Sequence, residues 1–518
     1  MNNDILAIGA GRIRQQCRVC LASGLIAGVV THLYIMTNKL PNWDDINNLY
    51  GYGGGDSFGR WMLKILRPLS GVWSVPALNG MLAILFFALS ACVILETLEL
   101  QSYSSAVLLP VIMLTFPSVA STMTFMFTVN TYALGLWIGC IGVWLSKKYV
   151  HGWIPGAALM LLCLAVYQSY ICLFAAVLLF DLVLGIFRQK DLEAAVKRGI
   201  HYLLSLVLAM GGYLLVTPLV SGELSGYRGI DSMGRIQLTQ VPHLMGRAYK
   251  RILDYFLMEP MSYVGKFGSI LNWLVILAEI LLFVYLLWKL EIYKKLPLLI
   301  LSCCLMGLIP LALSGIYVMA PQVSRASTLM LYQYGFVYVV LLGLTEIFLN
   351  ELEGQNIGWK KRAGQVLGAV FFLLVLGVGY DHFVLTNNAY FRMEIAYGRI
   401  HSFYERLYNR LEEQEGYQIG EPIAIMGDYW PEPNILSSAG FDLDRYQDME
   451  GISMENGLFT TGVRRQFMRT YLGIDYEEVS DEWQQEYIKT EEFKNKPSYP
   501  EQDCVWKKDG IWVIKVAN

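Results

Sequence analysis

Long apolar segments alternate with short polar stretches over the first three quarters of the chain. Most of them hold about 18 to 22 residues, which is the length that a helix needs to cross the hydrocarbon core of a bilayer. The third and the fifth are shorter, so we expect them to be tilted or re-entrant. The pattern predicts an α-helical polytopic membrane protein with about eleven transmembrane helices. These segments are residues 17–37, 76–97, 104–118, 129–146, 153–168, 169–187, 199–218, 270–288, 296–313, 327–349 and 363–384.

The pattern changes near residue 385. Residues 388–413 carry apolar positions at helical spacing, which predicts an amphipathic helix. The stretch "IAIMGD" at residues 423–428 is typical of a short buried strand, and the apolar runs on both sides of Asp509-Gly510 predict a β-hairpin. We therefore expect a transmembrane domain at residues 1–384 and a small α/β domain at residues 385–518.

Composition separates the same two parts. The chain of 518 residues is 55% hydrophobic and only 16% charged, whereas soluble domains carry about 25% charged residues. From Thr386 onward there are 14 Lys/Arg and 24 Asp/Glu, a net charge of −10, and the preceding part holds 26 and 19, a net charge of +7. A basic membrane part thus precedes an acidic part that is suited to water.

Basic residues between the apolar segments predict the orientation. With eleven crossings all the basic groups fall on one side, and an excess of Lys and Arg in short loops marks the cytoplasmic side. We therefore expect a cytoplasmic amino terminus and an extracytoplasmic α/β domain, whereas ten crossings would place some groups on the wrong side. The groups are Arg12, Arg14 and Arg18; Lys147 and Lys148; Arg188, Lys190, Lys197 and Arg198; Lys289, Lys294 and Lys295; and Lys360, Lys361 and Arg362.

Polar sequence gathers in the loops that this orientation places outside. These are residues 38–75, 220–267 and 314–327 and the tight turn at Val166 to Ile171. Loops on a rigid scaffold commonly carry function. The chain contains no GxGxxG or GxxxxGK[ST] phosphate loop, no HExxH metal motif and no GxSxG elbow. We therefore look for a site outside that needs no nucleotide and no cofactor.

The first of these loops, "NWDDINNLYGYGGGDSFGRW" at residues 42–61, places Asp44 and Asp45 directly after the first span. A carboxylate beside an acceptor hydroxyl can take its proton during sugar transfer, and a second one can orient that hydroxyl or share a metal ion. The alternative is structural, because Asn42 or Asp44 can cap a short helix. Glycines 53–55 allow the backbone to turn. The residues alone leave both interpretations open.

Cations at two places are candidates for contact with a phosphate group. Arg60 and Trp61 open the segment "GRWMLKILRPLSGVW", which suits an amphipathic helix on the membrane surface. Arg60, Lys64 and Arg67 are then expected to extend to the interface, with phosphate contact as the alternative for Arg60. Arg325 precedes a late span, where it can anchor the helix or bind a lipid phosphate through two hydrogen bonds. Further basic side chains of the long loop are not ranked: Arg228, Arg235, His243, Arg247, Lys250 and Arg251.

Tyr167, Gln168 and Tyr170 occupy the tight turn between the fifth and sixth spans. An aromatic belt at the interface accounts for the two tyrosines, and the amide of Gln168 can hydrogen-bond a sugar. Acids within spans are a functional signal, but a single one in mid-span, Glu279, does not make an ion pathway. The other two acids within spans are Asp181 and Glu346.

This combination of features resembles the bacterial GtrII-like glucosyltransferases of the O-antigen modifying type. The resemblance rests on residues 42–61 after the first span, on "AVYQSYI" at residues 165–171, on an Arg-containing loop before a late span and on a tail that begins with a long helix. It covers most of the chain in layout, and it is specific in the first loop and in the turn.

That family belongs to the GT-C membrane glycosyltransferases. The resemblance implies a multi-pass enzyme of the bacterial cytoplasmic (inner) membrane that transfers a sugar, glucose in this family, from a polyprenyl-phosphate-linked donor. The acceptor would be a lipid-linked or cell-surface polysaccharide on the outer face, and the anomeric carbon would be inverted. The resemblance makes Asp44 the general base and Asp45 its partner or substitute, although the adjacent acids differ from the spaced acids of some GT-C enzymes. The other candidate substrate-binding residues are Arg60, Trp61, Tyr167, Gln168, Tyr170 and Arg325.

Two other classes of function are weighed against this one. A transporter or flippase for a lipid-linked glycan should show paired halves with broken helices and polar groups at mid-membrane, whereas the polar sequence of this chain gathers on one face. A non-catalytic protein of envelope assembly would use its tail to bind a partner. No feature of the chain points to nucleic acid.

Overall fold

The computed structural model describes residues 14–50, 55–71, 73–226, 237–353, 358–427, 444–446, 448–453 and 458–516. The chain divides into two compact units. The membrane body comprises residues 1–39 and 50–387, and the second unit comprises residues 40–49 and 388–518. Each unit is described by itself. Some residues discussed above lie outside the described ranges: Arg12, Gly53, Gly54, Arg228, Arg235 and Asp428.

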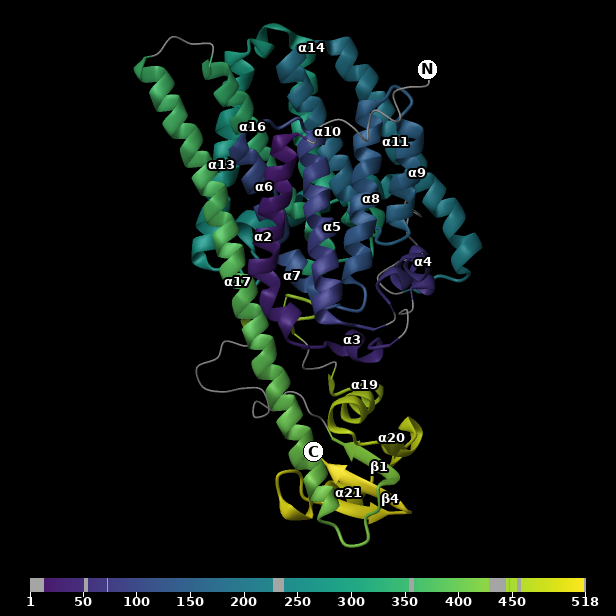
Figure 1. The fold of residues 1–518 in the computed structure, drawn as a ribbon. Helices are drawn as coiled ribbons and strands as arrows, with labels where there is room; N and C mark the ends of the chain where they lie inside the picture. The colour runs from purple at the N-terminus through teal and green to yellow at the C-terminus, as the bar shows by residue number, and fades with distance from the viewer. Residues whose placement is uncertain are drawn as a thin grey trace. The chain divides into compact units, whose positions relative to one another are not determined.

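Long helices lie side by side in the membrane body (Figure 1). Within the described residues, nine helices are long and apolar enough to cross a membrane, and a bent pair raises this to ten. This confirms the α-helical polytopic class. Together with shorter helices that are not counted among these spans, the main helices are α2 (Gln15–Thr37), α5 (Pro76–Thr97), α6 (Tyr103–Thr115), α7 (Pro117–Met123), α8 (Val129–Lys148), α9 (Trp153–Leu164), α10 (Tyr170–Gln189), α11 (Leu192–Ser221), α12 (Val241–Leu253), α13 (Lys266–Lys289), α14 (Leu296–Leu313), α15 (Ile316–Met319), α16 (Phe336–Glu353) and α17 (Trp359–Glu412).

The two segments expected to be short are the two that do not form long helices. The third is the pair α6 and α7, which bend by 51°. The bend falls at Phe116, because the residue before a proline is driven out of the helical region, and Pro117 follows it. The fifth is α9, whose 12 residues give about 18 Å of helix, less than the hydrocarbon core requires.

One expectation about the last span is wrong. A span at residues 363–384 and a separate helix at residues 388–413 were expected, but α17 is one helix of 54 residues, Trp359–Glu412. The sequence between its ends contains no proline, so nothing in the backbone interrupts the i to i−4 hydrogen bonds. The division between the two units falls within this helix, at residues 387 and 388.

Glycines let neighbouring helices of the membrane body approach closely. Helix α9 packs against α8 and α11. A Cβ atom on Gly142 of α8 would lie 2.6 Å from the carbonyl oxygen of Gly156 of α9. Ser146, one turn after Gly142, bonds to its carbonyl oxygen at 2.9 Å and to the hydroxyl of Ser205 of α11 at 2.9 Å. Lipid tails are as apolar as the helices, so the hydrophobic effect does not drive helices together inside a bilayer. Close packing of small residues and hydrogen bonds between hydroxyl groups hold them together instead.

We predict that Gly142→Ala destabilises the membrane body, because the added methyl group cannot fit against the backbone of α9. Overpacking of this kind costs about 1 to 3 kcal/mol. Gly211→Ala is the matched control, since a Cβ atom there would meet no heavy atom within 4 Å. The measurement is the thermal unfolding of the detergent-solubilised protein followed by size-exclusion chromatography. Equal midpoints for the two variants would contradict the tight contact.

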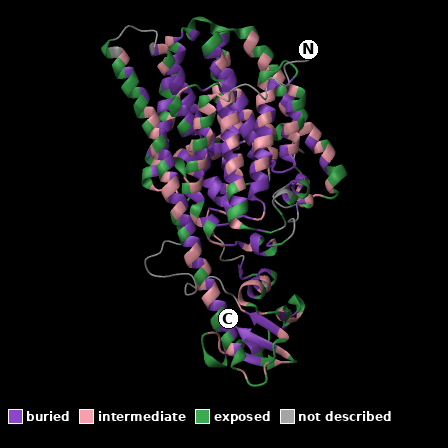
Figure 2. Ribbon diagram, in the orientation of Figure 1, coloured by how far each residue is buried: buried purple, intermediate pink, exposed green. Residues whose placement is uncertain are grey.

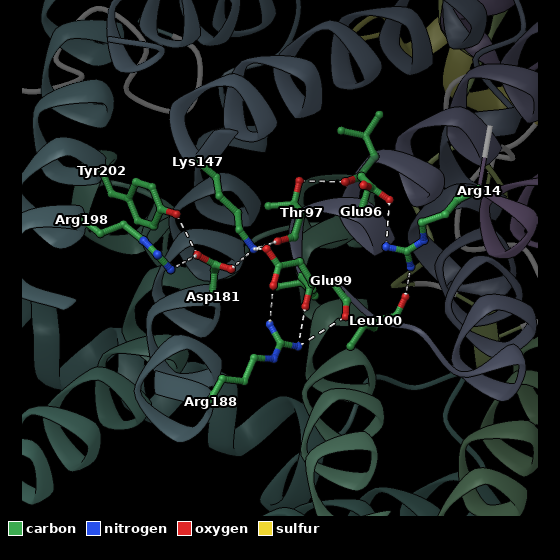
Figure 3. Close-up of polar contacts among 12 residues, drawn as sticks. Arg14, Glu96, Thr97, Glu99, Leu100, Lys147, Asp181, Arg188, Arg198 and Tyr202 are labelled. Atoms are coloured by element: carbon green, nitrogen blue, oxygen red, sulfur yellow. Dashed lines mark hydrogen bonds and ion pairs between the residues drawn. The ribbon is translucent and has the colours of Figure 1, made fainter. Parts of the chain in front are cut away.

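Charged side chains at one end of the membrane body form a network of ion pairs (Figure 3). We call this the basic end. Lys147 lies 2.7 Å from Asp181, which is only 1% exposed, and 3.0 Å from Glu99. The hydroxyl of Tyr202 donates to Asp181 at 2.7 Å, and Arg188 pairs with Glu99 at 3.3 Å. Each buried charge is compensated here, as burial in a medium of low dielectric requires.

The three acids within spans lie in different surroundings. Asp181 belongs to the basic end. Glu346 of α16 accepts hydrogen bonds from the backbone N–H groups of Gln101 and Ser102, at 2.5 and 3.2 Å, and from Ser105 Oγ at 2.9 Å. It thus provides acceptors for polar groups at the start of α6, where N–H groups have no partner within the helix. Glu279 of α13 is 8% exposed and lies within the bundle.

The second unit is built on a four-stranded sheet with the strand order β2-β1-β4-β3. Strand β1 (Gly420–Met426) runs parallel to β2 (Tyr476–Glu478) and to β4 (Ile511–Lys515), and β3 (Val505–Lys508) is antiparallel to β4. The expected strand and hairpin are thus confirmed. Asp509 and Gly510 have φ values of 51° and 82°, as the tight turn of a two-residue hairpin requires.

Short helices complete the second unit. They are α3 (Trp43–Asn47), α19 (Thr461–Phe467), α20 (Asp481–Tyr487) and α21 (Glu491–Asn495). Buried side chains of the sheet pack with Tyr487 and Phe493 in one apolar cluster. Figure 2 shows strands β1 and β4 as buried. The sheet therefore gives this unit a hydrophobic core of its own.

Glu421 stabilises the second unit through contacts with its ionised form. Its carboxylate accepts from Lys507 Nζ at 2.6 Å, from Trp512 Nε1 at 2.6 Å and from the N–H of Gln418 at 3.0 Å. The hydrogen bond from Lys507, followed by those from Trp512 and Gln418, lowers the pKa of Glu421 to about 2. A lowered pKa in the folded state gives a stabilisation that is complete above the ordinary pKa of 4.5 and is lost as the pH falls towards 2.

We predict that the second unit loses stability between about pH 5 and about pH 2 and that Glu421→Gln flattens this dependence. Hydrogen exchange of the β1 and β4 amides in the full-length protein, corrected for the intrinsic effect of pH, is the measurement. Glu415→Gln, which changes a carboxylate outside the sheet, is the control. The same acid dependence in Glu421→Gln as in the wild type would exclude this carboxylate as the cause.

Candidate active site

The acids of the first loop lie on a short helix of the second unit. Helix α3 begins after Asn42, whose side chain accepts from the N–H of Asp45 at 2.9 Å. Of the two possible helix caps, Asn42 is the one used. The carboxylates of Asp44 and Asp45 are therefore not the capping groups, and both residues lie in the first turn of α3.

Asp44 and Asp45 face different surroundings. Asp44 is exposed, whereas Asp45 is 1% exposed. Adjacent residues on a helix point about 100° apart, so only one of the two can face the interior. Helix α3 packs against α19 within the second unit. A substrate hydroxyl can reach Asp44 in this conformation, and Asp45 is held in place by its surroundings.

The second half of the first loop belongs to the membrane body and is fixed to the turn before α10. The N–H of Met62 donates to the carbonyl oxygen of Ala165 at 3.1 Å. Gln168, in the turn, donates through Nε2 to the carbonyl oxygen of Phe58 at 2.7 Å and to the hydroxyl of Tyr213 at 2.8 Å. Gln168 is 6% exposed, so its buried side chain connects the first loop to α11.

Gly59 permits this close approach. Its φ is +68°, and a Cβ atom there would collide with the hydroxyl of Tyr213. That hydroxyl donates to the carbonyl oxygen of Gly59 at 3.1 Å. Glycine is thus required on two counts, by its left-handed backbone and by the lack of space. We call the end of the membrane body that holds this contact the loop end.

Arg60 lies among aromatic rings at the loop end. Its guanidinium carbon is 5.0 Å from the ring centre of Tyr167, 5.8 Å from that of Phe58 and 5.9 Å from that of Tyr132. One terminal nitrogen donates to the hydroxyl of Tyr132 at 2.9 Å. The Nε atom is buried and has no hydrogen-bond partner in the described part of the chain. We call these four residues the aromatic box.

The charge of Arg60 is compensated by ring faces and not by an acid. Within the described ranges, no carboxylate forms an ion pair with Arg60. The third acid of the loop, Asp56, pairs with Lys64 instead. Burial lowers the pKa of Arg60, but the hydroxyls of Tyr132, Tyr167 and Tyr213 outweigh this and raise it. The side chain is half-buried, so the aromatic box holds a cation that an anion from solution can still approach.

Two further candidates line the same region. The indole N–H of Trp61 donates to Thr217 Oγ1 of α11 at 3.4 Å. Tyr170 is 2% exposed, and its ring packs edge-on against those of Tyr167 and Tyr332. Tyr170 therefore supports the aromatic box from behind, and Trp61 fastens the loop to α11.

Arg67 differs from the expectation for the surface segment. It was expected to extend to the interface, but it is 1% exposed and lies 5.2 Å from the ring centre of Phe127. The α-helical part of the segment is only α4 (Met62–Leu66), and a 3-10 helix with Pro68 near its start follows at Arg67–Ser70. The short helix turns Arg67 inward under the aromatic ring.

Arg325 lies on other elements of the membrane body. Its Nη2 atom is 3.1 Å from the sulfur of Met261, and the side chain is exposed. The contacts of Arg60 involve the first loop, α8 and the turn before α10, whereas those of Arg325 involve the segments beside α12 and α15. The structure thus brings Arg60, Trp61, Tyr167, Gln168 and Tyr170 together and places Arg325 apart from them.

Sequence reasoning missed Tyr132 and Tyr213. Both lie within spans, where a tyrosine gives no signal of its own. Among the described residues, no group of three or more His, Cys, Asp or Glu side chains could hold a metal ion. The side chains described above are carboxylates, guanidinium groups, an amide and aromatic rings.

A comparison with family models places the chain. The model of the family "Glucosyl transferase GtrII" matches residues 33–393. The chain belongs to the GtrII glucosyltransferase family. The match contains the first loop, the turn at Gln168 and the loop of Arg325, so all the candidate residues fall within it. No curated protein and no solved structure matches the chain.

Membership in the GtrII family confirms the resemblance noted in the sequence and makes the chain a membrane glycosyltransferase. A glycosyltransferase must bind a sugar donor and a glycan acceptor, and aromatic and amide side chains bind sugars through ring faces and hydrogen bonds.

We predict that Gln168→Leu detaches the first loop of this GtrII protein from α11. The change leaves the carbonyl oxygen of Phe58 and the hydroxyl of Tyr213 without their donor, which costs about 1 to 3 kcal/mol. The measurement is hydrogen exchange of residues 55–62, which should rise, with Gln237→Leu at an exposed position as the control. Unchanged hydrogen exchange in Gln168→Leu would show that the Gln168 amide does not hold the first loop against α11.

Proposed function

We propose that this GtrII protein transfers glucose from a polyprenyl-phosphate-linked donor to a lipid-linked or cell-surface polysaccharide, such as O-antigen. Transfer takes place on the outer face of the bacterial cytoplasmic membrane and inverts the anomeric carbon. The amino terminus and the basic end face the cytoplasm, which agrees with the excess of Lys and Arg there. The loop end and the second unit then face outward.

The observation that carries this proposal is the cation in the aromatic box. A half-buried cation that meets ring faces and no carboxylate is stabilised further when an anion binds. The phosphate of a lipid-linked sugar is such an anion, and it stays at the membrane surface because its isoprenoid chain remains in the bilayer. We assign Arg60, which has an unused Nε–H, to the donor phosphate, and we assign Arg325 to a phosphate as well.

Asp44 is the general base in this proposal. Its carboxylate takes the proton of the acceptor hydroxyl while the hydroxyl oxygen bonds to the anomeric carbon of the donor. The bond between that carbon and the phosphate oxygen breaks at the same time, and the phosphate leaves with the negative charge. A guanidinium group beside the leaving oxygen stabilises this charge as it develops. Asp44 is chosen because it is exposed, and Asp45 is the buried residue that positions it.

The aromatic side chains and Gln168 bind sugar and lipid in this scheme. Trp61, Tyr167 and Tyr170 provide ring faces, and the amide of Gln168 fixes the loop that carries Arg60. No metal or cofactor is part of the proposal, since a guanidinium group supplies the positive charge that a metal ion would otherwise supply.

We predict that Asp44→Asn reduces glucosyl transfer by at least about a hundredfold, because the amide cannot accept the proton. Asp45→Asn should lower transfer less. It should also shift the dependence of transfer on pH, because Asp45 positions Asp44 and does not itself take the proton. The measurement is transfer of labelled glucose from polyprenyl-phosphate glucose to the glycan acceptor in membranes that contain equal amounts of each variant.

Asp56→Asn is the matched control, because Asp56 is an acid of the same loop that pairs with Lys64. It should retain wild-type transfer. Full activity in Asp44→Asn, in Asp45→Asn and in the double variant would remove both acids from the mechanism. Loss of transfer in Asp56→Asn as well would mean that the assay reports the integrity of the loop and not the base.

A further inference from the structure

A second group of cations lies at the loop end of the membrane body, apart from the aromatic box. Arg247 and Arg251 project from α12, and Arg325 follows α15. All three act electrostatically on the hydroxyl of Tyr317 of α15. We call Arg247, Arg251, Arg325 and Tyr317 the α12 centre.

Arg247 holds the α12 centre together. Its Nη1 atom donates to the carbonyl oxygen of Pro321 at 2.8 Å, and its Nη2 atom donates to that of Tyr317 at 2.7 Å. The hydroxyl of Tyr317 in turn accepts from the N–H of Ala326 at 3.0 Å. Arg247 is therefore a positioning residue: it fastens the segment after α14 to α12 and so sets where Arg325 emerges.

Arg251 is only partly neutralised. Its Nη1 atom lies 3.7 Å from Asp254, and the same carboxylate oxygen accepts from Lys250 at the shorter distance of 2.7 Å. The Nε atom of Arg251 is buried and has no hydrogen-bond partner among the described atoms. One carboxylate thus serves two cations, which leaves positive charge on the guanidinium group.

Helix α12 combines an apolar face with basic side chains, a combination that suits a ligand at the membrane surface. Its buried residues Leu244, Ala248 and Ile252 recur every four positions, so α12 has one apolar face, which packs against α14 and α15. Arg247 and Arg251 flank this face. Arg251 is half-buried and Arg325 is exposed, and a guanidinium group suits a phosphate because it carries paired N–H donors.

We propose that the α12 centre binds the phosphate group of an isoprenoid lipid and that this phosphate is a different one from that bound by Arg60. The proposal rests on the proposed function, because glucosyl transfer from one lipid-linked substrate to another involves two lipid phosphates. The two sets of cations are held by different elements of the membrane body, so each can take its own phosphate. Arg251 and Arg325 are the ligands, and Arg247 positions them.

Binding is tested without any transfer reaction. The full-length protein in phosphatidylcholine nanodiscs is titrated with geranylgeranyl phosphate, and the bound lipid is counted by native mass spectrometry. The wild type should bind two molecules. Arg60→Gln should bind one, the double variant Arg251→Gln/Arg325→Gln should bind one, and the triple variant should bind none with comparable affinity. Loss of charge-assisted hydrogen bonds should weaken each affected site roughly ten- to hundredfold.

Three comparisons make the result specific. Lys266→Gln removes an exposed cation at the start of α13 and should leave both sites intact. Arg251→Lys keeps the charge but loses the paired donors, so it should weaken the site by an intermediate amount. Phosphatidylglycerol and inorganic phosphate are added as competitors, and neither should displace the isoprenyl phosphate at equal concentration.

Several results would overturn the inference. These are unchanged binding in Arg251→Gln/Arg325→Gln, equal weakening in Lys266→Gln, and full displacement by phosphatidylglycerol, which would make the α12 centre an anchor for ordinary lipid. Thermal unfolding of each variant separates lost binding from lost folding. Since no sugar is transferred in the assay, two bound phosphates with no glucosyl transfer would refute the proposed function alone, and active transfer with one bound phosphate would refute this inference alone.

Discussion

Compensation of buried charge is the constraint on which the arrangement of the membrane body depends. Where water is excluded, a charged group must meet an opposite charge or a set of dipoles. At the basic end, Lys147 lies between Asp181 and Glu99, and the chain supplies both signs. At the loop end, Arg60 meets ring faces and a tyrosine hydroxyl instead. The two ends thus solve the same problem differently: acids meet the cations of the basic end, whereas aromatic rings meet Arg60.

The proposed binding of a phosphate by Arg60 needs a rigid support, because a mobile side chain would turn towards water. Gln168 and Gly59 provide this support, the first by two hydrogen bonds to the loop and α11 and the second by a contact that allows no side chain. The turn before α10 is therefore not a simple connection between spans; it is the support of the aromatic box.

Sequence patterns predicted what depends on local composition. The spans followed from the length of apolar runs, and the hairpin followed from Asp509-Gly510, because bilayer thickness and turn geometry act on neighbouring residues. The continuity of α17 was missed because a polar stretch looks like an end even when no proline interrupts the helix. The burial of Arg67 and Asp45 was missed because it depends on residues far along the chain. The same holds for Tyr132, which meets Arg60 across 72 positions.

In the candidate site, too, the sequence revealed the residues that stand out locally and not those that depend on contacts between distant parts of the chain. Asp44, Asp45 and Arg60 stand out because polar residues directly after a span need an explanation, whereas Arg247 and Arg251 look like any cations of a long loop until α15 is placed beside them. Neither Arg60 nor Arg251 has a carboxylate to itself, since Arg60 meets ring faces and Arg251 shares Asp254 with Lys250. A cation of this kind gains stability when an anion binds, and this gain is the physical basis on which we propose that each of the two places takes a phosphate group.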